Sequence, residues 1–164
     1  IWAVLETALR GACEQFVESR IREGENLKLD LIEKLDGMLT DVAAIEKRSP
    51  EILQAYRTKL TEKVKELLSD TQLEESRIAT EVILYADKIC TDEETVRLHS
   101  HIESMKQTLQ TGGSIGRKLD FIAQEMNREA NTILSKANDL ETSNLAINLK
   151  TEIEKVREQI QNIE

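Results

Sequence analysis

The composition and the spacing of apolar residues predict an all-α protein of long helices that pack as an elongated, antiparallel, coiled-coil-like bundle. The 164 residues include one proline and only 3% aromatic residues, and abundant Leu, Ile, Glu, Lys and Ala are typical of helices packed side by side. In several segments apolar residues recur at alternating steps of four and three, the period of a helix that buries one side. A hydrophobic content of 40% is sufficient for a core.

The first helix is expected over residues 1–47. Apolar seams run through both of its halves and predict that it packs along its whole length. The seam residues are Ile1, Leu5, Ala8, Ala12 and Phe16, then Leu27, Leu31, Leu35, Met38, Val42 and Ile45. Gly24 lies between the seams in a charged stretch, at a cost of about 1 kcal/mol relative to alanine. It is either a tolerated glycine on a solvated face, the favoured reading, or a point of close approach for a ligand.

Residues 50–90 are expected to form a helical hairpin arm. Ser49 and Pro50 are typical of an N-cap and a first helical position, so a new helix is predicted to begin there. That helix is expected to end near residue 68, and a turn at 69–71 leads to a helix over 73–89.

Residues 91–164 are expected to form three helices, over 92–109, 116–136 and from about 139 to the chain end. Thr91 followed by Glu94 has the spacing of a capping box. Gly112 and Gly113 interrupt the pattern and predict a linker, and Asn138 or Asp139 is expected to cap the last helix.

The charge of the chain limits its partners. With 31 acidic and 22 basic residues the formal net charge is −9, so the overall field repels nucleic acid unless basic groups gather locally. Residues 115–136 are mildly positive and depart from that trend.

No segment is long and apolar enough to cross a bilayer, and no leader segment is expected. Cys13 and Cys90 lack metal or redox spacing and are expected to be reduced, buried thiols of a cytoplasmic protein.

The helix over 116–136 has an unusually varied polar face. Its apolar side is expected to pack on the core, while the opposite side mixes guanidinium, amide, hydroxyl and carboxylate groups. A face that needs only to be wetted is usually filled with Glu and Lys. The aromatic Phe121, which falls among polar positions, adds to this variety, and we expect the face to bind a ligand.

Two sets of side chains on these helices are candidates for ligand binding or catalysis. Glu94, Arg97 and His101 share one helix face, which suits a ligand or acid/base set, although a histidine beside an arginine is more often a packing residue. Glu125 and Glu129 lie one turn apart and repel unless a cation lies between them. Lysine side chains or a divalent metal ion would supply that cation. No phosphate-binding glycine loop, dinucleotide fingerprint, zinc pattern or nucleophile elbow is present.

Long strings of this sequence resemble one protein family. The string GRKLDFIAQEMNREANTILSKAND, followed by LKTEIEKVREQIQNIE, is similar to the C-terminal part of the YicC family, bacterial proteins described as metal-dependent endoribonucleases. IREGENL and DEETVRLHSHI resemble further family segments in the same order. The resemblance implies an oligomer, with a hexamer expected, and a separate N-terminal domain that this chain lacks.

The resemblance also marks particular residues. They are Arg22, Glu23, Gly24, Glu94, Arg97, His101, Gly116, Arg117, Asp120, Gln124, Glu125, Asn127, Arg128, Glu129, Asn131, Ser135, Lys136, Arg157, Glu158, Gln159, Gln161 and Asn162. His99 is left open by the family pattern.

The leading hypothesis is a divalent-metal-dependent endoribonuclease whose site is lined by the helices over 1–47, 92–109 and 116–136. Because a phosphodiester is negatively charged, cleavage needs a cation to activate the attacking oxygen and stabilise charge. The expected ion is Mn²⁺ or Mg²⁺, and an imidazole ligand favours manganese. The expected catalytic residues are His101, Glu125 and Glu129, and the expected metal ligands are Glu94, His101, Glu125 and Glu129. The expected RNA-binding residues are Arg22, Arg97, Arg117, Lys118, Phe121, Arg128 and Lys136.

Two alternatives remain open from the sequence. In the first, the apolar seams serve oligomerisation and the helix over 116–136 binds a protein partner through its varied polar face. In the second, the chain binds RNA without cleaving it, as an adaptor for another nuclease.

Overall fold

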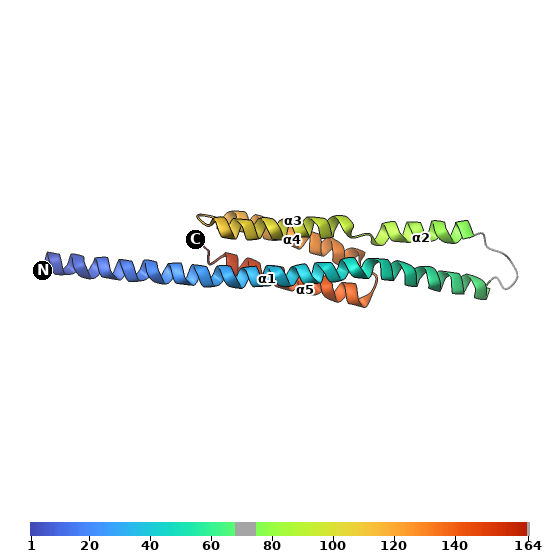
Figure 1. Cartoon of the computed structure of the whole chain (residues 1–164), viewed down its shortest axis with the longest axis horizontal. Helices are drawn as coiled ribbons and strands as arrows, with labels where there is room; N and C mark the ends of the chain where they lie inside the picture. The colour runs from blue at the N-terminus through green and yellow to red at the C-terminus, as the bar shows by residue number, and fades with distance from the viewer. Residues whose placement is uncertain (68–74, 164) are drawn as a thin grey trace.

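The computed structural model describes residues 1–67 and 75–163, and these form five helices with no strand. The helices are α1 (Trp2–Leu67), α2 (Glu75–Ile89), α3 (Asp92–Thr111), α4 (Gly116–Lys136) and α5 (Leu140–Ile160). They lie along one long axis (Figure 1), so the predicted all-α, elongated architecture is confirmed. The turn expected at 69–71 lies outside the described residues. None of the described helices is both long and apolar enough to cross a membrane.

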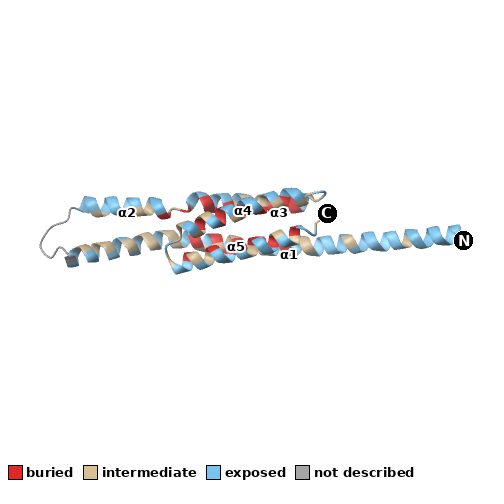
Figure 2. Ribbon diagram, turned by 180° about the vertical axis from the view of Figure 1, so that it is seen from behind, coloured by how far each residue is buried: buried red, intermediate tan, exposed pale blue. Residues whose placement is uncertain are grey.

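The core lies in a four-helix section made by the middle of α1 together with α3, α4 and α5. Around this section α1 packs against α3 and α5, and α4 packs against the same two helices. His99 of α3 lies 3.3 Å from Glu46 of α1, and Lys106 pairs with Asp36, so these two helices run antiparallel. The buried residues concentrate in this section (Figure 2). They are Leu31, Leu35, Met38, Val42, Ile45, Leu98, Ile102, Met105, Leu109, Leu119, Ala123, Met126, Ala130, Ile133, Ala146, Leu149, Ile153, Val156 and Ile160.

The predicted helix break at Ser49 and Pro50 is wrong, because α1 continues through Pro50 to Leu67. Proline removes the N–H that would bond to the carbonyl four residues earlier, but tertiary contacts hold the helix on both sides. Arg48 bonds Glu51 across the proline at 2.9 Å and also lies 3.3 Å from Asp139. Beyond it, Tyr56 stacks on Tyr85 of α2, with ring centroids 3.7 Å apart. The arm therefore consists of the end of α1 packed against α2.

The first third of α1 extends beyond the bundle (Figure 1). Every residue of its predicted seam is exposed, including Phe16, and Trp2 is exposed as well. Cys13 lies on this segment and is exposed, so the expectation of two buried thiols is wrong for Cys13, while Cys90 is partly buried and both are free. Free cysteines are usually buried, but among the described residues no helix covers this part of α1.

The predicted ends of the later helices are largely confirmed. Gly112 and Gly113 follow α3 with φ values of 68° and 84°, a left-handed conformation that glycine adopts without steric cost. Asp139 caps α5, because its side chain accepts a hydrogen bond from the Thr142 N–H at 3.3 Å. These two connections fix the antiparallel order of α3, α4 and α5.

Candidate functional site on helices α3 and α4

His101, Glu125 and Glu129 come together on the face shared by α3 and α4. One ligand atom from each residue lies within 4.8 Å of those of the other two. The core positions them, because His101 adjoins the buried Ile102 and Glu129 adjoins the buried Ala130. Packing of these two helices therefore brings an imidazole next to two carboxylates. Their catalytic and metal-binding roles stay predictions.

The three residues differ in access to solvent. Glu129 is 5% exposed, His101 is partly buried and Glu125 is exposed. Arg128 lies on the solvent side with its Nη1 3.8 Å from Glu125 Oε2, and its side chain is 76% exposed. The cluster is thus at the surface, with one well-buried carboxylate at its base.

Arg97 of α3 links this cluster to other acidic groups. Its Nε forms an ion pair with Glu129 Oε1 at 2.9 Å, and its Nη1 and Nη2 donate to Glu93 and Glu94 at 3.1 and 3.3 Å. The bond with Glu129, followed by that with Glu93, raises the pKa of Arg97 above its usual value. Its guanidinium therefore carries a permanent positive charge beside the cluster.

Glu94 is engaged by basic groups instead of joining the cluster. The Lys136 ammonium group bonds both oxygens of Glu94, at 3.0 and 3.1 Å, and the Cys90 carbonyl at 2.9 Å. The predicted capping box is wrong, since the Thr91 side chain makes no capping hydrogen bond and Glu94 turns to these cations. Desolvation explains this choice: the side chain of Glu94 is 5% exposed, and a buried carboxylate requires a charged partner. Its role as a metal ligand stays a prediction that this geometry does not favour.

The other expected RNA-binding residues occupy two different places. Arg117, Lys118 and Phe121 are exposed on α4, and Phe121 lies one helical turn before Glu125. Arg22 lies on the exposed first third of α1. The rest of α1 packs mainly on α2, α3 and α5. The structure therefore builds the site from α3 and α4, and it does not bring the Arg22 segment into it.

Sequence reasoning missed several contacts of this site, among them the ion pair of Arg97 with Glu129. Glu93 precedes Arg97 by four residues, and this helical spacing was a usable signal for the ion pair between these two. Lys136 and Glu94 are 42 residues apart, and no local pattern links them. Asp120 pairs with Arg157 of α5 at 3.1 Å, so these two marked residues join α4 to α5. Asp120 also accepts a hydrogen bond at 2.7 Å from Gln124 of the same helix.

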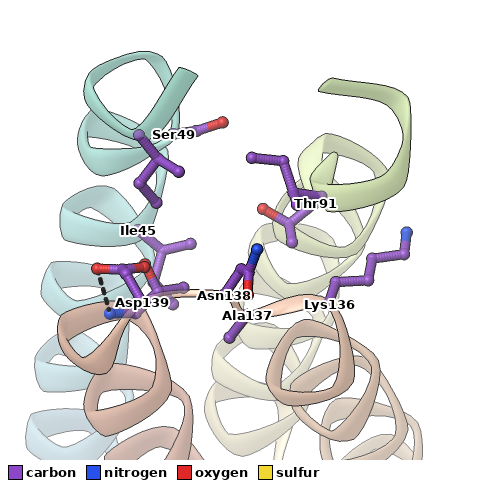
Figure 3. A pocket seen from close by; sticks show the side chains of 10 residues that line it. Ile45, Ser49, Thr91, Lys136, Ala137, Asn138 and Asp139 are labelled. Carbon is purple, nitrogen blue, oxygen red and sulfur yellow. Dashed lines mark hydrogen bonds between the residues drawn. The ribbon is translucent and has the colours of Figure 1, made fainter. Parts of the chain in front are cut away.

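A small cavity lies near the start of α5, where the arm meets the bundle (Figure 3). Its volume of about 20 Å³ is room for about one water molecule and excludes a nucleotide. Within the described part of the chain, Asp139 Oδ1 and Thr142 Oγ1 are buried without a hydrogen-bond partner. Figure 3 shows Lys136 at its edge with the ammonium group directed away. This cavity is not the candidate site.

Comparison with known proteins agrees with these observations. A family model described as "Endoribonuclease YicC-like, C-terminal" matches residues 45–164. A protein of Clostridioides difficile named "Probable endoribonuclease YicC" is 45% identical over 165 residues, covering 100% of this chain and 56% of that protein. A protein of Haemophilus influenzae with the same name is 37% identical over 160 residues, covering 98% of this chain and 55% of that protein. The chain thus spans about half the length of the curated relatives it matches.

Proposed function

Because this chain belongs to the YicC-like family, we propose that it is the C-terminal helical part of a divalent-metal-dependent endoribonuclease. The reaction is cleavage of RNA phosphodiester bonds. The observation that carries the proposal is the convergence of His101, Glu125 and Glu129 within 4.8 Å on a solvent-facing surface. We further propose a cytoplasmic, hexameric enzyme, in line with the family resemblance.

The donor set fits a divalent cation. One imidazole nitrogen and two carboxylates suit manganese better than magnesium, which prefers oxygen ligands and retains several waters. Arg97 engages Oε1 of Glu129, so a cation bound at the cluster competes with Arg97 for that carboxylate. When bound, the ion supplies activation of the attacking oxygen and neutralises charge on the phosphoryl oxygens.

The surrounding side chains are suited to hold RNA. Arg128 is exposed beside Glu125, and Arg117 and Lys118 are exposed near the start of α4, where they meet phosphates. Phe121 is 60% exposed and offers a stacking surface for an unpaired base. Recognition by stacking and charge favours single-stranded RNA.

The test is RNA digestion by the complete protein. Wild type should shorten RNA with Mn²⁺ and leave it intact with a chelator, and Glu125→Gln/Glu129→Gln should lower the rate at least 100-fold while its circular dichroism is unchanged. The control is Glu62→Gln/Glu66→Gln, another pair of glutamates one turn apart, both of which are exposed on the arm. Equal cleavage by both double variants would refute the proposed site.

One observation favours a second function. The exposed apolar seam at the start of α1, which includes Trp2 and Phe16, is typical of a surface that another protein covers. If the chain is only an interaction module, the complete, purified protein will not cleave RNA with any divalent metal. If it is an RNA-binding adaptor, the protein will shift RNA on a gel with Mn²⁺ without shortening it.

A further inference from the structure

Arg97 differs from the other basic residues near the cluster in how it is held. Lys136 bonds both oxygens of Glu94 and a main-chain carbonyl at 2.9–3.1 Å. Arg97 has one short contact, 2.9 Å to Glu129, and bonds of 3.1 and 3.3 Å to Glu93 and Glu94, while its side chain is 44% exposed. Lys136 thus serves one buried carboxylate, whereas Arg97 is shared among three carboxylates and its side chain is the more exposed of the two, 44% against 32%.

Charge counting shows what a cation would change at this face. The four carboxylates are those of Glu93, Glu94, Glu125 and Glu129, and the three basic groups that contact them belong to Arg97, Arg128 and Lys136. With His101 neutral the sum is −1, and a divalent cation makes it +1. The face therefore repels a phosphodiester before a cation binds and attracts one afterwards.

We propose that Arg97 is a phosphate-binding residue whose availability is controlled by the cation. Arg97 and a cation compete for Glu129, because both are positive and both need its carboxylate. When Glu129 turns to a cation, Arg97 loses its short contact and becomes available to hydrogen-bond a phosphodiester group. Two parallel bonds form where two guanidinium nitrogens each reach a phosphate oxygen. This inference rests on the proposed function and adds an order of binding, with the cation before RNA.

The inference predicts opposite effects of one substitution on two ligands. Arg97→Gln removes the competitor for Glu129, so the affinity for Mn²⁺ should rise about 10-fold, within the usual range of coupling between sites. The same substitution removes a phosphate contact, so the affinity for single-stranded RNA with Mn²⁺ should fall about 10-fold and the salt dependence should flatten by about 0.7 log unit per log unit of salt. A residue that only supports the fold would not shift two affinities in opposite directions.

The metal arm uses the 164-residue chain, with bound Mn²⁺ measured by electron paramagnetic resonance, and the RNA arm uses the complete protein and a short unpaired oligonucleotide. Arg157→Gln is the matched control, since Arg157 also contacts a carboxylate of α4 through Nε at 3.1 Å with a side chain 39% exposed. Arg97→Lys keeps the charge, so its Mn²⁺ affinity should stay within about threefold of wild type. Thermal unfolding checks that every variant is folded.

The outcomes separate this inference from the proposed function. Tighter Mn²⁺ binding with weaker RNA binding in Arg97→Gln supports the inference. Unchanged or weaker Mn²⁺ binding overturns it, as does RNA binding equal to that of wild type. If wild type and Glu125→Gln/Glu129→Gln bind Mn²⁺ equally, the proposed metal site itself fails.

Discussion

Replacement of Lys136 by methionine tests whether this residue holds the fold or binds RNA. The sequence predicted an RNA contact, but the structure shows its ammonium group bonded to both oxygens of Glu94, which is 5% exposed. Removing one partner of a buried ion pair costs about 3–5 kcal/mol. Lys136 is itself 32% exposed and Arg97 still contacts Glu94, so we expect a loss of about 2 kcal/mol.

Urea unfolding followed by circular dichroism measures this loss. Lys118→Met is the control, because Lys118 lies on the same helix and is exposed, and its cost should stay below about 0.5 kcal/mol. Adding Glu94→Gln to Lys136→Met should cost less than the sum of the single changes, since each removes the same ion pair. If Lys136→Met leaves the free energy of unfolding unchanged and only weakens RNA binding, the structural role is refuted and the sequence prediction stands.

Two further predictions concern α1 and α5. Pro50→Ala should raise the free energy of unfolding by about 1–3 kcal/mol in urea titrations, since it restores the N–H that bonds to the Glu46 carbonyl in a continuous helix. A lower free energy of unfolding in this variant would show that the proline stabilises the fold. At Asp139 burial acts to raise the pKa, but hydrogen bonds from Thr142 and Arg48 outweigh it and lower the pKa below 3.8. The stability that the carboxylate contributes is therefore complete above its unfolded pKa and lost as the pH falls through the lowered folded pKa. Asp139→Ala should cost about 1 kcal/mol at pH 7, and the difference from wild type should shrink below about pH 4; a constant difference would contradict the assigned hydrogen bonds.

Local patterns predicted most of the fold because helices reveal themselves in short segments. The seam from Leu31 to Ile45, the glycines at 112 and 113 and the cap at Asp139 each depend on neighbours within a few residues. Pro50 was misread because its local signal is a helix start, whereas contacts from α2 and α5 hold the helix through it. Local preference decides an element only where tertiary packing is weaker.

The candidate site was predictable only in part. Helix spacing put Glu125 and Glu129 on one face, and their approach to His101 follows once α3 and α4 pack through their apolar sides. The partners of Glu94 were not predictable, because the register between α3 and α4 decides which basic residue lies opposite a buried carboxylate. That register depends on how the side chains of buried residues such as Met105 and Met126 fit together. No short sequence pattern encodes this fit.

The number of exposed basic groups near the cluster limits what this chain contributes to RNA affinity. Arg117, Lys118 and Arg128 are exposed, and Arg97 joins them under the cation-controlled scheme. Four phosphate contacts on single-stranded RNA correspond to a salt slope of about −3, while the net charge of −9 opposes binding elsewhere. A steeper slope for the complete protein therefore requires phosphate contacts from other residues or from neighbouring subunits. Under the proposed function, RNA affinity then resides mainly in the complete protein and its proposed assembly, and the α3–α4 face is the position at which we expect the RNA to be cut.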